Sequence, residues 1–290
     1  MEFSQIKNEL GKRLGDKYRF YSAKLDSCQS MGDLLTWVHQ SMNKLGAERV
    51  FTSEGLLALF TQAELDSVQV FVRNPDQGVL IPEKLKVQGF YYVFGGHVVQ
   101  SAHNLHGSFF EGTVAEVKAG HASFFDQTSG TLNGPSVGHV FRQARVTVLG
   151  GASAHFFNES TGVGKEQSHI VCMGYSSVEL FDKAFGLAME QSKVTFHQQT
   201  RGRAMGDSVC LCTDKSSVIF GEKAQGLIDT AGKIETTGTN VLYKLSTKAT
   251  IAANKTSRVV AVTAKEAEQF LEQYKRYTPT PAQKPVFQSD

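Results

Sequence analysis

The chain has 290 residues, and its 30 Lys and Arg residues nearly balance its 28 Asp and Glu residues. The resulting net charge of +2 provides no dominant attraction to a polyanion, so we expect no nucleic-acid partner. Four cysteines in a chain of this length do not make the dense disulfide framework of a small secreted protein. The N-terminus lacks the apolar core of a signal peptide, and no stretch approaches about 18 apolar residues. We therefore expect a cytoplasmic protein with no membrane partner.

Residues 1–78 are predicted to form a helical N-terminal region. Apolar residues recur at four-residue spacing in its first helix, at Ile6, Leu10 and Leu14. A second amphipathic run covers Met31–Leu45, and further helices are predicted to start at Thr52 and at Thr61, where Glu64 completes a capping box. Turn-forming residues at 73–78 separate this region from a β-like stretch at 79–94.

From Asn104 to Thr263 the chain divides into successive octads whose first residue is small for most of the run. Sixteen consecutive first positions are Gly112, Gly120, Thr128, Ser136, Ala144, Ala152, Ser160, Ser168, Ser176, Ala184, Ser192, Thr200, Ser208, Ser216, Ala224 and Gly232. A strict short repeat indicates a stack of similar turns, because each unit can bury its apolar side only against the next. The third and fifth positions are mostly apolar or Gly, whereas the second and fourth include polar residues such as Arg145, Glu179 and Lys193. This two-residue alternation predicts one short strand per octad.

Eight residues cannot close a turn around a core, so we expect two octads per coil. The sixth position of every second octad supports this length, because it is aromatic or Met at Phe109, Phe125, Phe141, Phe157, Met173, Met189 and Met205. The sequence therefore predicts a mainly β fold: a parallel β-solenoid over residues 79–263 with about sixteen residues per coil. The Phe and Met column is expected to form a stacked ladder near one bend.

A helix is predicted over residues 264–277, because Thr263 and Glu266 form another capping box. Its apolar face consists of Ala267, Phe270, Leu271 and Tyr274. We expect this helix to cap the last coil, since an uncovered strand edge can pair with other chains. The tail at 278–290 contains three prolines and is expected to be extended or disordered.

The runs of the type small-x-Val-x-Ala/Phe-x-x-x resemble the paired eight-residue units of bacterial ice-nucleation proteins. They resemble still more closely the uncharacterised octapeptide-repeat β-solenoid proteins of bacteria and phages. The resemblance covers about residues 88–263 and implies a sixteen-residue solenoid coil in a protein of phage or mobile-element origin. The outward positions hold no regular Thr-x-Thr array, so ice activity is not expected.

No catalytic, cofactor-binding or metal-binding motif is predicted. His139 and His155 should lie side by side on the outside of neighbouring coils, where they could share a divalent metal. No carboxylate occupies that column, however, and structural metal sites usually need four ligands. Cys210 and Cys212 occupy the third and fifth positions of their octad and are therefore predicted to be core residues.

Some outward positions are apolar, which points to contact surfaces. On one face these positions are Val171, Phe185, Leu187, Ile219 and Ile251. On the other they are Val209, Leu211, Leu227, Val241, Tyr243 and Val259. Either a partner or the chain's own helical segments or tail could cover each face. The predicted interaction surface consists of Val171, Phe185, Leu187, Arg201, Arg203 and Ile219.

The sequence favours a non-catalytic structural or protein-interaction module that binds itself as a homo-oligomer or binds another protein. The alternative is a ligand-binding protein or enzyme whose site lies between the helical region and the first coils, where Trp37, His97, His103 and His106 would converge. A third hypothesis is nucleic-acid binding along a basic stripe formed by Arg145, Lys193, Arg201 and Arg203, which the near-neutral charge disfavours.

Overall fold

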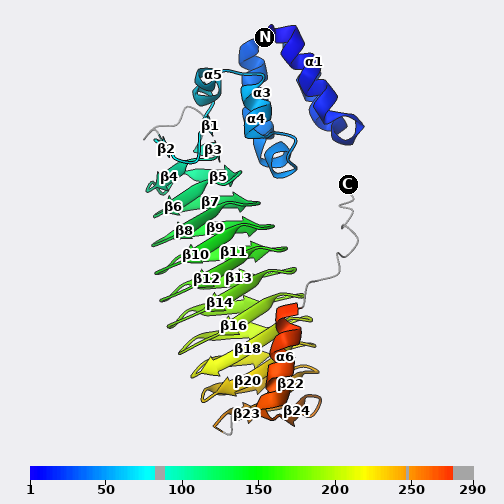
Figure 1. Cartoon of the computed structure of the whole chain (residues 1–290), viewed down its shortest axis with the longest axis vertical. Helices are drawn as coiled ribbons and strands as arrows, with labels where there is room; N and C mark the ends of the chain where they lie inside the picture. Colours follow the sequence, from blue (N-terminus) through cyan, green and yellow to red (C-terminus); the bar gives the residue numbers. More distant parts are fainter. Residues whose placement is uncertain (82–88, 246–247, 277–290) are drawn as a thin grey trace. The chain divides into compact units, whose positions relative to one another are not determined.

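The computed structural model of the chain describes residues 1–81, 89–245 and 248–276. It confirms a mainly β fold in which two parallel sheets form a solenoid of about 11 turns with about 16 residues per turn (Figure 1). The chain divides into two compact units, Met1–Gly162 and Val163–Asp290. Residues 82–88 of the predicted β-like stretch and the predicted tail at 278–290 lie outside the described residues.

Odd-numbered strands form one sheet and even-numbered strands form the other. The odd-numbered sheet contains β1 (Val70–Val72), β3 (Phe90–Phe94), β5 (His106–Phe110), β7 (Gly120–Phe125), β9 (Ser136–Phe141), β11 (Ser153–Phe157), β13 (His169–Cys172), β15 (Phe185–Ala188), β17 (Arg201–Ala204), β19 (Ser217–Phe220), β21 (Lys233–Thr236) and β23 (Thr250–Ala252). The even-numbered sheet contains β2 (Gly78–Val79), β4 (His97–Gln100), β6 (Val114–Val117), β8 (Ser129–Leu132), β10 (Arg145–Val148), β12 (Thr161–Gly164), β14 (Ser177–Leu180), β16 (Lys193–Phe196), β18 (Val209–Asp214), β20 (Gln225–Thr230), β22 (Val241–Lys244) and β24 (Arg258–Ala261).

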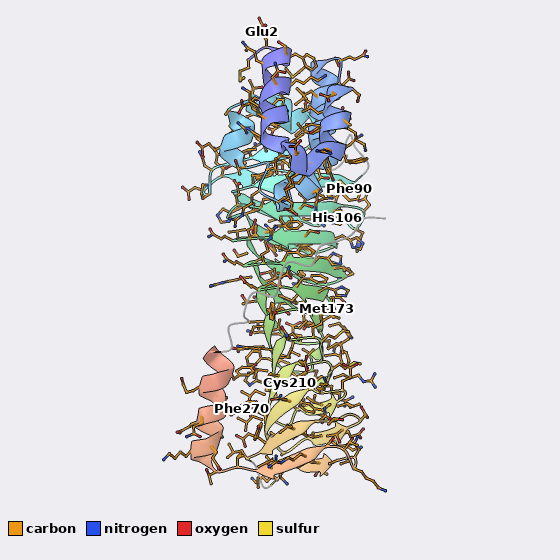
Figure 2. The ribbon with its side chains drawn as sticks, turned by 90° about the vertical axis from the view of Figure 1, so that its right-hand side faces the viewer. Glu2, Phe90, His106, Met173, Cys210 and Phe270 are labelled. Atoms are coloured by element: carbon orange, nitrogen blue, oxygen red, sulfur yellow. The ribbon has the colours of Figure 1, made fainter. Side chains whose placement is uncertain are left out.

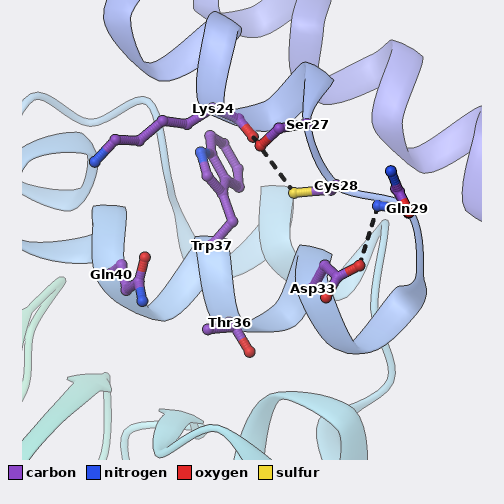
Figure 3. A pocket seen from close by; sticks show the side chains of 8 residues that line it. All are labelled: Lys24, Ser27, Cys28, Gln29, Asp33, Thr36, Trp37 and Gln40. Carbon is purple, nitrogen blue, oxygen red and sulfur yellow. Dashed lines mark hydrogen bonds between the residues drawn. The ribbon is translucent and has the colours of Figure 1, made fainter.

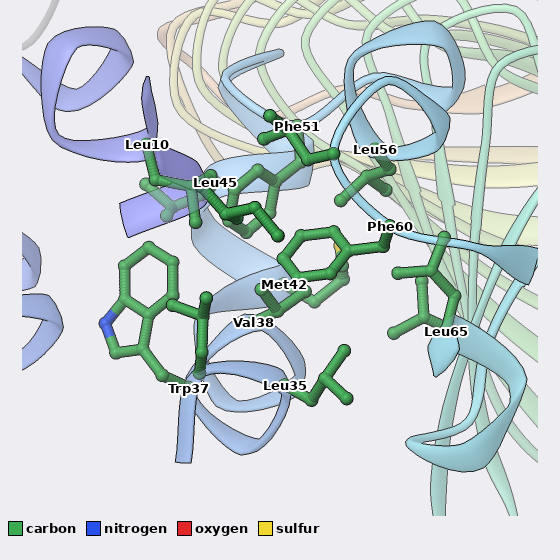
Figure 4. Close-up of a cluster of buried hydrophobic side chains, with 14 of the residues drawn as sticks. Leu10, Leu35, Trp37, Val38, Met42, Leu45, Phe51, Leu56, Phe60 and Leu65 are labelled. Carbon is green, nitrogen blue, oxygen red and sulfur yellow. The ribbon is translucent and has the colours of Figure 1, made fainter. Parts of the chain in front are cut away.

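The first unit begins with helices, as predicted. They are α1 (Phe3–Leu14), the 3-10 helix η1 (Asp16–Tyr18), α2 (Arg19–Asp26), α3 (Met31–Ala47), α4 (Ser53–Leu57) and α5 (Gln62–Ser67). Thr61 and Glu64 form the predicted capping box of α5. The apolar sides of the helices meet in a core around Trp37 and Met42 (Figure 4), and this core also includes Phe94 and Phe110 from the first strands. Strand β1 starts at Val70, within the stretch that the sequence assigned to helices.

A regular octad consists of a four-residue strand and a four-residue turn. Strand β10, Arg145–Val148, occupies the second to fifth positions, and the turn ends in a backbone hydrogen bond such as Ala152 N–H to Leu149 O. The seventh residue has a positive φ in every octad from Asp126 to Glu222. The first residue of a regular octad, such as Ala144, is buried directly before the strand of that octad. The limited space there explains why the repeat keeps this residue small.

Side chains of neighbouring coils hydrogen-bond to the turns in the second unit. The Asp182 carboxylate accepts the N–H of Glu166, and the Asp214 carboxylate accepts the N–H of Gln198. Glu222 accepts the N–H of Gly206 in the same way on the other row of turns. A residue with positive φ costs about 1–2 kcal/mol when it is not Gly. These bonds help to offset that cost, because each satisfies a backbone donor at the turn of the adjacent coil.

Inside the solenoid, a large residue on one sheet faces a glycine on the other. The glycine lies six positions after the large residue: Phe124 and Gly130, Leu132 and Gly138, Phe156 and Gly162, Leu180 and Gly186, Phe196 and Gly202, Phe220 and Gly226. A Cβ atom added to Gly138 would lie 2.3 Å from Leu132 Cδ1. Where the earlier residue of such a pair is small, as at Ala188, the residue six positions after it is larger, as at Val194. Each coil therefore keeps a similar core volume.

Aromatic rings stack along one edge of the odd-numbered sheet in the first unit. Neighbouring ring centroids lie 4.8 to 5.0 Å apart along the series Phe94, Phe110, Phe125, Phe141 and Phe157. The predicted stacking of Phe125, Phe141 and Phe157 is confirmed, but the predicted membership of Phe109 is wrong. The coil between β5 and β7 has fifteen residues, since His106 pairs with His121, so Phe109 instead aligns with the inward-facing Phe124.

The last coils also depart from sixteen residues, which corrects two predicted orientations. Ile234 pairs with Ile251, and Leu242 pairs with Val259, because one extra residue lies between β22 and β23. Ile251 and Val259 therefore align with the buried Ile234 and Leu242, not with the outward positions that a constant octad predicts, although Val259 on the last strand is 38% exposed. A one-residue change in register moves a side chain to the opposite face of a strand.

The predicted C-terminal helix is present as α6 (Ala264–Arg276), but its position differs from the expectation of a cap across the last coil. Phe270 contacts Tyr243 on β22, with ring centroids 5.2 Å apart, and Tyr274 contacts Thr195 on β16. The helix thus runs back along the outer face of the even-numbered strands (Figures 1 and 2). Its apolar side finds more partner surface there than a single terminal strand provides.

Candidate interaction surface

The six residues of the predicted interaction surface lie on the outer face of the odd-numbered sheet in the second unit. Register places Phe185 beside Arg201, and it places Val171, Leu187, Arg203 and Ile219 in one row across β13, β15, β17 and β19. All six side chains are exposed or half-buried. We call this group of six residues the odd-face patch.

The odd-face patch is hollowed on the side that leads to β21. A cavity of about 470 Å³ is lined by Phe185, Arg201, Gly202, Arg203, Ser217, Val218, Ile219, Lys233 and Glu235. Phe185 remains 39% exposed, although its ring is large and apolar. Aromatic and Arg side chains around an apolar depression are the composition typical of protein interfaces.

The outer face of the even-numbered sheet differs from the odd-face patch, because α6 packs against it. Leu227 is buried, and Tyr243 is half-buried beneath Phe270. Lys193 donates a hydrogen bond to Tyr274 O, and burial at this contact lowers the pKa of Lys193. A helix of the chain itself therefore packs on this apolar face. The sequence left open whether a partner or the chain's own segments would do so.

Four histidines follow one another on the outer face of the odd-numbered sheet in the first unit. The rings of His106 and His121 stack at 5.8 Å, and those of His139 and His155 lie 5.4 Å apart, as predicted for neighbouring coils. His106 also contacts Ser123 Oγ at 3.2 Å. Burial, and then the charge of neighbouring imidazoles, lowers the pKa of both His106 and His139. Within the described residues no three His, Cys, Asp or Glu side chains are placed to hold a metal ion.

These pKa shifts predict a loss of stability in mild acid. The unfolded chain takes up protons at the ordinary His pKa of 6.5, before the folded chain does. The stabilisation is therefore complete above pH 6.5 and decreases as the pH falls below that value. We expect the urea midpoint to fall between pH 7.5 and pH 5.5, and to fall less in the variant His106→Gln/His139→Gln. His103→Gln, at an exposed position, is the control, and an equal loss in all three proteins would contradict the prediction.

The residues of the predicted junction site do not converge. His97 belongs to β4 and His106 to β5, so the two lie in opposite sheets, and His103 lies in the turn between these strands. Trp37 is buried in α3 against Phe51. The cavity beside it is lined by Lys24, Ser27, Cys28, Gln29, Asp33, Thr36, Trp37 and Gln40, and by none of these histidines (Figure 3).

The predicted basic stripe is not assembled either. Arg201 and Arg203 project from the odd-numbered sheet, whereas Arg145 and Lys193 belong to the even-numbered sheet. Lys193 is moreover engaged by α6. Successive octads alternate between the two sheets, so these four residues do not form one stripe.

The cysteines of the second unit are core residues. Cys172, Cys210 and Cys212 are fully buried, in agreement with the predicted inward positions of Cys210 and Cys212 (Figure 2). Burial raises the pKa of Cys210 to about 12. A thiol in this environment stays protonated and is a poor nucleophile.

Comparison with known proteins adds no assignment, since no family model, curated protein or solved structure matches the chain. Within the described residues, none of the helices combines the length and the apolar character that crossing a bilayer requires.

Proposed function

We propose that the protein is a non-catalytic interaction module whose solenoid presents the odd-face patch to a second copy of the chain or to another protein. The observation that carries this proposal is the contrast between the two sheets of the second unit. On the even-numbered sheet Leu227 is buried and Tyr243 packs under Phe270 of α6, whereas Phe185 on the odd-numbered sheet remains 39% exposed. An exposed apolar depression that is lined by Arg residues is typical of a surface that binds another protein.

The proposal is tested by the double substitution Phe185→Glu/Leu187→Lys. Both side chains point outward from β15, so the solenoid core and the β-rich circular dichroism spectrum should be unchanged. The mass in solution of the parent should exceed the 31.7 kDa of one chain, either as a homo-oligomer or with a co-purifying partner. The double variant should return to the mass of one chain.

The control is Phe20→Glu, which repeats the Phe-to-Glu change of the double variant at another exposed aromatic residue, in α2. It should behave like the parent. A parent protein that runs as a single chain without any partner would contradict the proposal. The same holds if the double variant retains the parent's mass and partners.

A further inference from the structure

Two exposed arginines project side by side from the middle of the odd-face patch. Arg201 and Arg203 lie on β17 and point outward, while Gly202 between them faces the core. A strand rises about 3.3 Å per residue, so the two side chains start about 6.6 Å apart. The pair therefore presents two guanidinium groups at the spacing of alternate residues in an extended chain.

The charge of this pair is not neutralised by an ion pair within the described residues. Within the described part of the chain, neither Arg201 nor Arg203 has an ion-pair partner, whereas the nearby Lys233 pairs with Glu235. Neighbouring coils place Phe185 and Leu187 on one side of the arginines and Ile219 on the other. Apolar groups around a charge reduce its screening by water, so a carboxylate bound here would be held more strongly than on an open polar surface.

We propose that the odd-face patch binds an extended acidic segment of a partner protein, with two carboxylates at alternate positions seated on Arg201 and Arg203. The inference rests on the proposed function and adds the chemistry of the partner. Alternate side chains of an extended peptide point to the same side, so acidic residues at positions i and i+2 match the spacing of the two arginines. Each guanidinium can bind a carboxylate through two parallel hydrogen bonds.

A nucleic acid fits this surface less well. Backbone binding of a nucleic acid depends on a series of cations along its length. The other two basic residues considered from the sequence, Arg145 and Lys193, belong to the opposite sheet. With Lys233 paired to Glu235, the two arginines are the cations of this cavity that have no ion-pair partner within the described residues, and they suit two carboxylates.

The test uses the full chain and two fluorescent peptides of identical composition. The first, Ser-Thr-Glu-Thr-Glu-Thr-Ser, carries its acids at alternate positions, and the second, Ser-Thr-Glu-Glu-Thr-Thr-Ser, carries them at adjacent positions. Fluorescence anisotropy at low salt should show at least about tenfold tighter binding of the first peptide. Arg201→Gln/Arg203→Gln should weaken that binding by at least about tenfold, because it removes the charge and the bidentate donors. Arg258→Gln, at an exposed position on β24, should leave it unchanged.

Equal affinity for the two peptides, or binding that survives the double Arg substitution, would overturn the inference. Tighter binding of an oligothymidylate than of the first peptide, lost in the same variant, would replace the acidic segment with a nucleic acid and would also overturn it. If Phe185→Glu/Leu187→Lys lowers the mass in solution while neither peptide binds, the proposed function stands and only the acidic partner is rejected.

Discussion

Phe220→Ala is expected to lower the free energy of unfolding by about 3–5 kcal/mol, the usual cost of removing a fully buried ring. Phe220 is inaccessible to solvent, and its ring occupies the space above Gly226. Gly226→Ala should also destabilise, by about 1–3 kcal/mol, because the new Cβ would lie 2.6 Å from Phe220 Cζ. The remaining neighbour of that Cβ, Cys210 O, is at an ordinary contact distance of 3.4 Å.

The pairing of large and glycine positions makes these effects non-additive. Phe220→Leu/Gly226→Ala should cost less than the sum of its two single substitutions, since the shorter side chain leaves room for the added methyl group. Urea denaturation followed by circular dichroism measures all four proteins of this cycle. Additive costs would mean that the two residues do not share one space in the core.

Phe141→Ala is expected to cost about 2–3 kcal/mol, less than a fully buried ring because Phe141 is half-buried. Its ring stacks on Phe125 at 5.0 Å and on Phe157 at 4.9 Å, so the substitution removes two aromatic contacts. The single tryptophan, Trp37, lies in the same unit and provides a fluorescence signal for its unfolding. Phe141→Leu should recover part of the loss through apolar contact alone. A cost below about 1 kcal/mol would show that the ladder contributes little to stability.

The parts of the fold that were predictable are those that depend on periodicity. The two-residue alternation within octads and the sixteen-residue repeat of large side chains identified parallel strands, their inward faces and the coil length. Cys210 and His155 accordingly lie where the repeat placed them. The errors arose where the repeat changes length, as at Phe109 and Val259, because an insertion or deletion of one residue in a turn leaves no mark in composition.

The interaction surface was only partly accessible from sequence. Alternation showed that Phe185 and Leu227 point outward from their strands, but not which of them the C-terminal helix would cover. That choice depends on how the apolar side of α6 fits a particular sheet, which is a tertiary interaction. The turns held by side chains of the adjacent coil were also missed, although a signal existed: from Asp126 to Glu222 the seventh position of every octad is Gly, Asp, Asn, Glu or Gln, except at Arg142.

Because consecutive octads alternate between the two sheets, we expect the chain to tolerate insertions or deletions of whole sixteen-residue coils but not of single octads. Loss of sixteen residues removes one coil and leaves every later strand in its own sheet. Loss of eight residues between β15 and β17 would place Arg201 and Arg203 on the sheet opposite to Phe185 and Leu187, because every later strand would change sheets. Variants that differ by whole coils should therefore keep the residues of the odd-face patch together, whereas variants that differ by a single octad within the patch should divide them between the two sheets.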